Sequence, residues 1–187
     1  MKINKSIFTI SLCLTASMVA SKSIADEHRQ HAPHVHGVGQ LQVAVDGTAL
    51  SIDMESPAIN VVGFEHPPGN TEEKERVHTA ADLLRQGGSL FAPTPDADCR
   101  LTESSADSEL LADQHDHEGE HHHEGEEHHS AFHAHYLFHC KNPQALTYTD
   151  VYLFRHFPAM ETLEAQFVTD RGQGAAKLTP GAFRLMF

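Results

Sequence analysis

The stretch HVHGVGQLQVAVDGTALSIDMES, residues 34 to 56, predicts a β-hairpin near the start of the fold. Apolar residues alternate with small or polar ones in two runs: Val35, Leu41, Val43 and Val45, then Leu50, Ile52 and Met54. Strict alternation places one side of each run in a core and the other side in solvent. Asp46 and Gly47 between the runs are typical of a tight turn. Gly37 and Gly39 predict a bend or bulge where the first strand starts.

One main helix is expected after this hairpin. The intervening segment PAINVVGFEHPPGN has no clean period, but from Thr71, an N-cap candidate, the pattern becomes helical. Acidic residues occupy the first turn. Four apolar positions share one helix face: Val77, Ala80, Ala81 and Leu84. Gly87 and Gly88 are expected to end the helix.

The stretch AFHAHYLFHC, residues 131 to 140, is a second alternating run. One face carries Phe132, Ala134, Tyr136, Phe138 and Cys140, and the other carries His133, His135 and His139. Further strands are expected in a short piece around Cys99–Leu101 and in TYTDVYLF, LEAQFVTD, AAKLT and AFRLMF. Six or seven strands with one helix indicate a single α+β domain whose sheet is mostly antiparallel. No parallel βαβ repeat is visible.

The N-terminus has the three parts of a secretory signal peptide. Lys2 and Lys5 precede an apolar run from Ile7 to Ala20, and small residues at 23–25 predict cleavage after Ala25. About 14 apolar residues are too few to span a bilayer of roughly 30 Å. We therefore expect residues 1–25 to be removed and residues 26–187 to form an exported domain. No later run is apolar enough to insert into a membrane.

Charge and cysteine content narrow the classes of partner. The full chain has 26 acidic and 13 basic residues, and loss of the leader would remove three lysines, leaving a formal charge of about −16. Such a surface repels nucleic acid and attracts cations. Cys99 and Cys140 are the two cysteines of the expected mature chain, and an oxidising compartment favours one disulfide between them.

The stretch HDHEGEHHHEGEEHHSAFHAH, residues 115 to 135, contains nine histidines and six acids without any lysine or arginine. Residues 115 to 130 lack every large apolar side chain, so a mobile loop is expected at about 112–130. Imidazole and carboxylate groups are ligands for Zn²⁺, Cu²⁺ and Ni²⁺. Seven histidines of this loop are therefore candidate ligands: His115, His117, His121, His122, His123, His128 and His129.

A structured metal site is expected beside the loop. His34 and His36 are two residues apart on an expected strand, so their side chains share a face, and His133 and His135 repeat this spacing. If the two strands were neighbours, four imidazoles could bind one zinc ion. Glu65 and His66 before two prolines form a weaker candidate pair. The alternative for each pair is an exposed side chain without a metal.

The sequence shows no catalytic constellation. HEGEH, residues 117 to 121, satisfies the H-E-x-x-H pattern of zinc proteases. That mechanism needs a helix that places both histidines on one face, whereas this segment contains Gly119 and has no apolar face with which a helix could dock. We therefore predict no catalytic residues and no enzymatic activity.

Several motifs together resemble the ZrgA-like periplasmic zinc-binding proteins. These are HVHG, SPAINVVGFEH, a histidine-rich insert before FHAHYLFHC, and then DVYLF, FP and LTP with a final Arg-Leu. The resemblance covers nearly the whole expected mature chain. It implies a periplasmic location, Zn(II) as the bound ion, and a role beside an ABC-type zinc importer.

The leading hypothesis is thus a periplasmic protein that captures Zn(II) with a structured histidine site and a histidine-rich loop and assists high-affinity zinc uptake. A nickel or copper buffer is an alternative, because Cu²⁺ binds such ligands more tightly than Zn²⁺. A zinc hydrolase, and an acidic module that docks a basic partner, are further alternatives.

Overall fold

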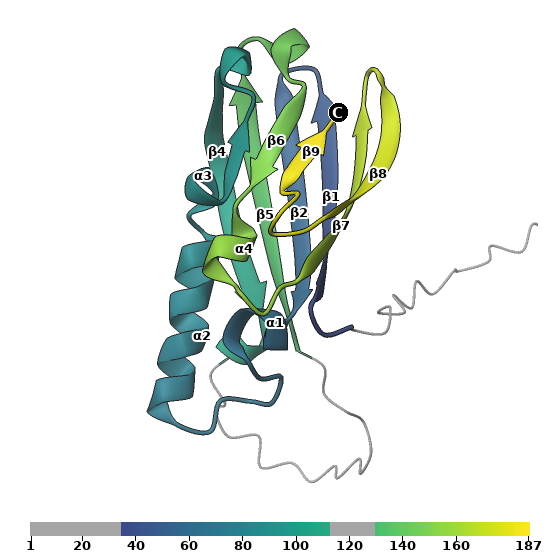
Figure 1. Ribbon diagram of the computed structural model, residues 1–187. Coiled ribbons are helices and arrows are strands. Elements are labelled where there is room, and N and C mark those ends of the chain that lie inside the picture. Colours follow the sequence, from purple (N-terminus) through teal and green to yellow (C-terminus); the bar gives the residue numbers. More distant parts are fainter. Residues whose placement is uncertain (1–34, 113–129) are drawn as a thin grey trace, which may run out of the picture. The chain divides into compact units, whose positions relative to one another are not determined.

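A computed structural model describes residues 35–112 and 130–187 (Figure 1). Two segments lie outside the described residues. The first, residues 1–34, contains the expected leader, and the second, residues 113–129, contains most of the histidine-rich stretch. In chain order the elements are β1 Val38–Asp46, β2 Ala49–Pro57, α1 Ala58–Val62, α2 Thr71–Leu84, α3 Gly87–Leu90, β3 Phe91–Pro93, η1 Pro95–Ala97, β4 Cys99–Ser108, η2 Glu109–Leu111, β5 Ala131–Cys140, η3 Pro143–Ala145, β6 Tyr148–Val151, α4 Leu153–His156, β7 Thr162–Thr169, β8 Gly172–Leu178 and β9 Arg184–Met186. Within this part of the chain, no helix is both long and apolar enough to cross a membrane.

The first two strands form the hairpin that the alternation predicts. β1 and β2 pair antiparallel around a turn in which Gly47 has φ +55°. Leu41 lies opposite Met54, and both side chains are buried. The bend expected at Gly37 is also present, because its φ is +82°, a value that residues with a Cβ rarely adopt. The hairpin prediction is therefore confirmed, except that Val35 lies before β1 and is 58% exposed instead of buried in the core.

The strands form two sheets. One has six strands in the order β4-β5-β2-β1-β7-β8, and the other has three in the order β3-β6-β9. Every pairing is antiparallel except β1 with β7. The prediction of an α+β fold with a mostly antiparallel sheet is thus confirmed. The described residues contain nine strands rather than six or seven; one of the unexpected strands is β3, which has only three residues next to prolines and therefore shows no pattern.

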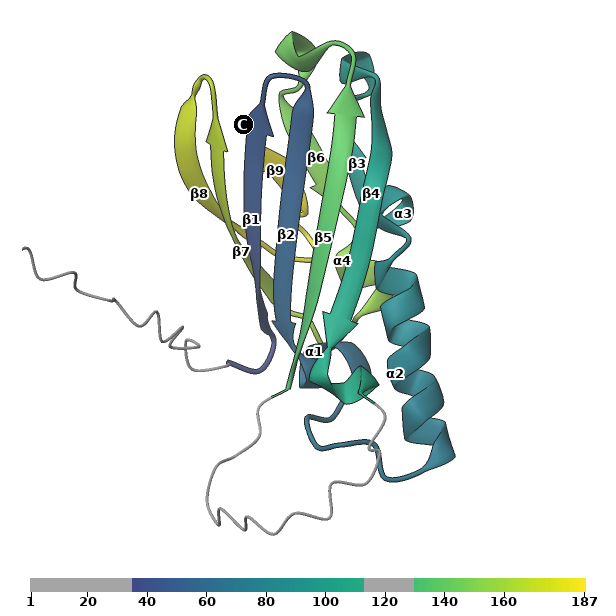
Figure 2. The same cartoon turned by 180° about the vertical axis from the view of Figure 1, so that it is seen from behind.

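The two faces of the six-stranded sheet have different surroundings. The three-stranded sheet and α4 lie against one face, and the core between them includes Ile52, Phe91 and Leu185, each at most 1% exposed (Figure 1). In Figure 2 the opposite face is in front, and neither the small sheet nor α2 covers it. We call this the outer face; it carries exposed polar residues such as Gln42 and Asp53.

The N-cap of the main helix is one residue earlier than expected. Asn70, not Thr71, is the N-cap, and its side-chain oxygen accepts a hydrogen bond from the backbone N–H of Glu73 at 2.9 Å. The four residues expected to face the core are the buried ones. The main helix ends at Leu84, with Arg85 as its C-cap, shortly before the two glycines that were expected to close it. Gly87 also starts α3 and is buried against Tyr136, where a Cβ would lie 2.3 Å from the ring.

The expected disulfide joins Cys99 to Cys140. These residues are paired neighbours at one end of β4 and β5, and the two strands stay paired as far as Ser108 and Phe132. The expected three-residue strand at Cys99 is therefore too short. Its remaining residues are mostly polar, because β4 is an edge strand of the sheet with several exposed side chains.

The segment TYTDVYLF is a strand only in its first half. β6 ends at Val151, and Leu153–His156 form α4, so the prediction of one continuous strand is wrong. The backbone N–H of Tyr152 still donates to the carbonyl of Leu90, in register with β3, and the chain then turns into α4. The partners β3 and β9 have only three residues each, so a longer β6 would have no strand to pair with.

Candidate metal-binding region

A buried asparagine connects the two motifs HVHG and SPAINVVGFEH. Asn60 of α1 is 2% exposed, and its side-chain oxygen accepts a hydrogen bond from the N–H of Gly37 at 2.7 Å. Its amide nitrogen donates to the carbonyl of Val38 at 3.0 Å and to the hydroxyl of Ser56 at 3.1 Å. A buried amide is costly unless its polar atoms are paired. Asn60 therefore holds the start of β1 against α1.

The turn before β1 is held from a second side as well. The carbonyl of Gly37 accepts hydrogen bonds from the backbone N–H groups of Glu161 and Thr162, at 2.8 and 2.9 Å. These residues lead into β7, the parallel neighbour of β1. His36 immediately precedes this fixed glycine, so its backbone is attached to an anchored turn.

The anchored turn brings His36 close to Glu65. Nε2 of His36 lies 3.8 Å from Oε2 of Glu65, and the two side chains are 63% and 15% exposed. Gly63, with φ +88°, ends α1 and turns the chain, and Glu65 lies two residues after this turn. An imidazole and a carboxylate that are 29 positions apart in the sequence thus lie side by side at the edge of the fold.

His66 has a defined ring orientation. Its Nδ1 lies 3.0 Å from the carbonyl oxygen of Pro67, and its ring stacks on Phe64 with centroids 4.9 Å apart. A carbonyl oxygen can only accept, so Nδ1 carries the proton in this contact, and in the neutral ring the lone pair is on Nε2. A backbone carbonyl in this position is common behind histidines that bind metal through the other nitrogen.

His133 and His135 lie elsewhere, on the outer face of β5. Nδ1 of His135 is 2.8 Å from Oδ1 of Asp53, and Nδ1 of His133 is 3.9 Å from Oε2 of Glu55. Strand β2 separates β5 from β1. The condition for a four-imidazole site, neighbouring strands, is therefore not met for β1 and β5.

The remaining candidate ligands lie outside the described residues. These are His34, His115, His117, His121, His122, His123, His128 and His129. Ser130, the first described residue after the histidines at 115–129, has a defined contact: its carbonyl accepts a hydrogen bond from the N–H of Ala58 at 2.8 Å. The histidine-rich stretch thus joins the described fold beside the first residue of α1.

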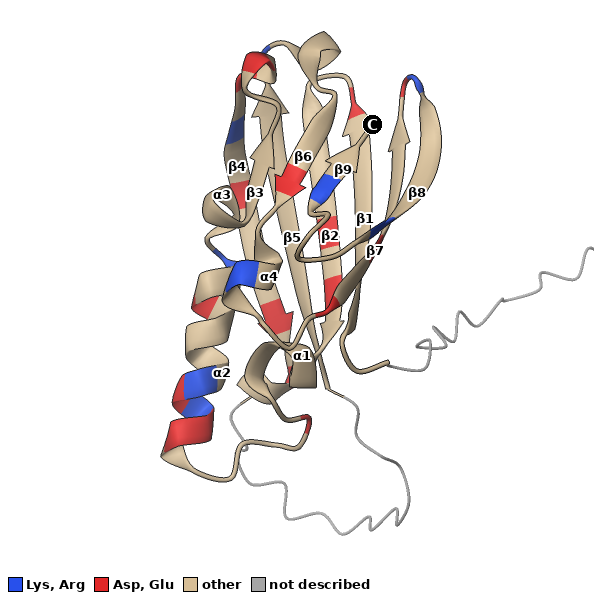
Figure 3. Cartoon of the chain, in the orientation of Figure 1, with Lys and Arg blue, Asp and Glu red and all other residues tan. Residues whose placement is uncertain are grey.

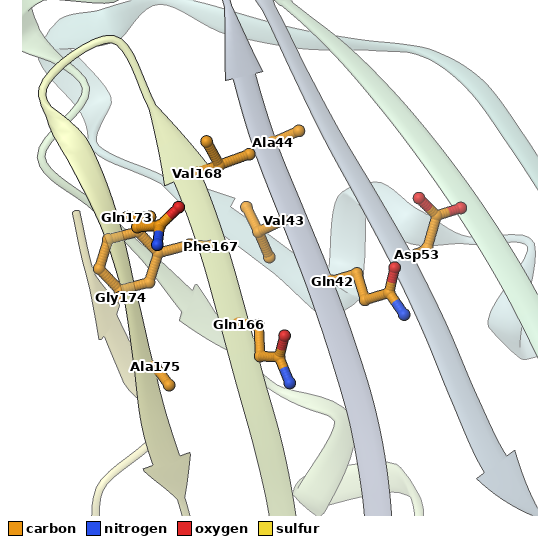
Figure 4. A pocket seen from close by; sticks show the side chains of 10 residues that line it. All are labelled: Gln42, Val43, Ala44, Asp53, Gln166, Phe167, Val168, Gln173, Gly174 and Ala175. Carbon is orange, nitrogen blue, oxygen red and sulfur yellow. The ribbon is translucent and has the colours of Figure 1, made fainter.

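Within residues 35–112 and 130–187, no three His, Cys, Asp or Glu side chains are already placed to hold a metal ion. An open groove of about 690 Å³ crosses the outer face, lined in part by Gln42, Asp53, Gln166 and Gln173 (Figure 4). None of the candidate histidines in the described residues lines it, but Asp53, which does, is the contact partner of His135.

Sequence analysis missed several residues that shape this region. Asn60 was hidden inside the mixed apolar segment, and the acidic partners of β5 were not identified. Asp53 and Glu55 are two positions apart in β2, the same spacing as His133 and His135 in β5. Matching these two spacings could have suggested cross-strand pairs.

Residues 33–187 match the family model described as ZrgA family zinc uptake protein. No curated protein matches the chain. The matched range includes HVHG, SPAINVVGFEH and FHAHYLFHC, so the resemblance noted in the sequence is confirmed. The chain belongs to the ZrgA family of zinc uptake proteins.

Proposed function

We propose that the chain is a periplasmic, non-enzymatic protein that captures Zn²⁺ through His36, Glu65 and His66 and supplies it for high-affinity uptake. Family membership supports zinc as the ion and uptake as the process. The disulfide supports an oxidising compartment, since such bonds are rare in the cytosol.

The contact between His36 and Glu65 carries this proposal. Two ligand atoms that each lie about 2.1 Å from a tetrahedral zinc ion are about 3.4 Å apart. The observed separation of 3.8 Å exceeds this value only slightly. A small rotation of the exposed His36 side chain would bring the two atoms to ligand distance.

His66 is the third proposed ligand, because its Nε2 is available while Nδ1 donates to Pro67. It follows Glu65 directly and its ring is held by Phe64. His34, two positions before His36, is the further ligand expected from the sequence. Three or four such groups satisfy the coordination of Zn²⁺.

The histidine-rich stretch has the role of a collector in this proposal. It joins the fold at Ser130, next to α1, and α1 leads into Glu65. Tethered ligands raise the local concentration of bound ions near a second site. Components of an ABC-type zinc importer are the proposed recipients of the metal.

Calorimetric zinc titration of the mature chain at pH 7.5 tests the site. The double variant His36→Ala/His66→Ala is expected to lose the tightest class of sites, with affinity lower by at least about tenfold, or 1.4 kcal/mol. His78→Ala is the matched control, because His78 is an exposed histidine on α2. An unchanged tight class in the double variant would contradict the site.

Two further titrations test the collector and the ligand type. Deletion of residues 115–130 is expected to remove several weaker equivalents and to keep the tight one. At pH 5.5 all classes are expected to weaken, because protons compete for imidazoles whose ordinary pKa is about 6.5. If the deletion abolishes all binding, the stretch itself is the site.

A further inference from the structure

The outer face of the six-stranded sheet carries a block of two imidazoles and two carboxylates. In the antiparallel register of β2 and β5, Asp53 lies opposite His135 and Glu55 lies opposite His133. The two histidine side chains are 42% and 43% exposed, and the carboxylates 58% and 44%. All four groups are therefore on the outer face of the sheet and in contact with solvent.

Both rings present the same nitrogen to the carboxylates. Nδ1 of His135 donates to Asp53 at 2.8 Å, and Nδ1 of His133 is the atom nearest Glu55, at 3.9 Å. This pattern, with a carboxylate behind one ring nitrogen, orients a histidine that binds metal through the other nitrogen. Nε2 of each ring is the nitrogen left for a ligand.

A further carboxylate lies on the other side of β5. Asp107 of β4 is directly opposite His133, so its side chain is on the same face, and the residue is exposed. Directly opposed residues have Cβ atoms about 4.5–5.5 Å apart. His133 is thus flanked by a carboxylate from each neighbouring strand.

We propose that this block is a second site for a divalent cation of the zinc class, independent of His36, Glu65 and His66. His133 and His135 bind the ion through Nε2 and Asp107 supplies an oxygen ligand, while Asp53 and Glu55 hold the rings. No three of these groups are already placed to hold an ion, so the side chains must adjust on binding, and their partial exposure allows this.

The charges on β2 favour the binding of a cation next to β5. β2 contributes acidic but no basic residues to this face (Figure 3). His139 of β5 differs from His133 and His135, because it lies opposite Arg100 on β4 and Ala49 on β2. The positive charge of Arg100 opposes cation binding there, so His139 is a matched control on the same strand and face.

The test is zinc titration of the full mature chain, followed both by calorimetry and by NMR of the histidine ring protons. His133→Ala/His135→Ala is expected to bind one equivalent fewer than the parent, and His139→Ala the same number. Asp53→Asn is expected to keep the stoichiometry and weaken this equivalent about tenfold, as other residues that orient a ligand do.

In the parent protein, zinc should shift the ring signals of His133 and His135 and leave those of His139 in place. The variant His36→Ala/His66→Ala should keep these shifts, so failure of the proposed primary site would leave this one standing. Unmoved ring signals in the parent, or an unchanged stoichiometry in His133→Ala/His135→Ala, would overturn the second site.

Discussion

The two faces of β5 contrast more than any two regions of the described fold. Phe132, Tyr136 and Phe138 point inward and are at most 3% exposed, whereas His133 and His135 alternate with them on the outer face. Apolar burial on the inner face supplies stability, because it removes large side chains from water. The outer face contributes little burial and is therefore available for ion pairs and ligands.

The largest expected change in stability comes from replacing a residue on the inner face of β5. Phe132→Ala is expected to lower the free energy of unfolding by about 4 kcal/mol, because it leaves a cavity in the core. His133→Ala, the next residue, should change it by less than about 0.5 kcal/mol. Urea unfolding of both metal-free variants measures the difference, and equal losses would show that the faces are not independent.

A smaller effect is expected where α3 meets the inner face. Gly87→Ala should destabilise the fold by about 2–3 kcal/mol, because the added Cβ would lie 2.3 Å from the ring of Tyr136. Gly88→Ala is the control, since nothing lies within 4 Å of its added Cβ. Thermal unfolding of the pair distinguishes close approach from a general effect of replacing glycine.

The hydrogen bonds of Asn60, which we call the Asn60 clamp, connect the core to the candidate site. Asn60→Ala is expected to lower the free energy of unfolding by about 2 kcal/mol, because the N–H of Gly37 and the carbonyl of Val38 lose their partner. It should also weaken zinc binding at the tightest sites, since His36 immediately precedes the turn at Gly37. Denaturation and zinc titration give the two readouts, and full stability with intact affinity would refute the clamp.

The smallest expected effect is a charge effect in the three-stranded sheet. Hydrogen bonds from Arg184, at 2.6 and 2.9 Å, hold the pKa of the buried Asp150 below its ordinary value. The carboxylate therefore adds stability above the unfolded pKa of about 3.9, and this is lost as the pH falls through the lower folded value.

Asp150→Asn should accordingly cost about 1 kcal/mol at pH 7 and much less at pH 2. Urea unfolding at the two pH values measures this change. A loss of the same size at both would assign the effect to packing rather than to charge.

Much of the fold follows from local patterns. The alternation in residues 34–56 and 131–140 predicted β1, β2 and β5 with the correct buried faces, and the helical period predicted the buried residues of α2. Short elements such as β3 and α4 were missed, because three or four residues carry too little periodicity and their partners decide their form.

For the site, the sequence alone determined which residues have metal-binding chemistry, because imidazole and carboxylate groups ligate wherever they are brought together. Two cysteines in an exported chain likewise predicted the bond between Cys99 and Cys140. These conclusions depend on residue type and compartment, and they need no knowledge of strand order.

Only the tertiary structure decided which of these groups meet. Strand β2 lies between β1 and β5, and His133 and His135 therefore face carboxylates of β2 and β4. His36, which precedes β1, instead lies near Glu65. Strand order depends on how all the apolar faces pack together, and a local pattern does not contain that information. The same sheet thus separates two groups of histidines that the sequence had suggested might form one site.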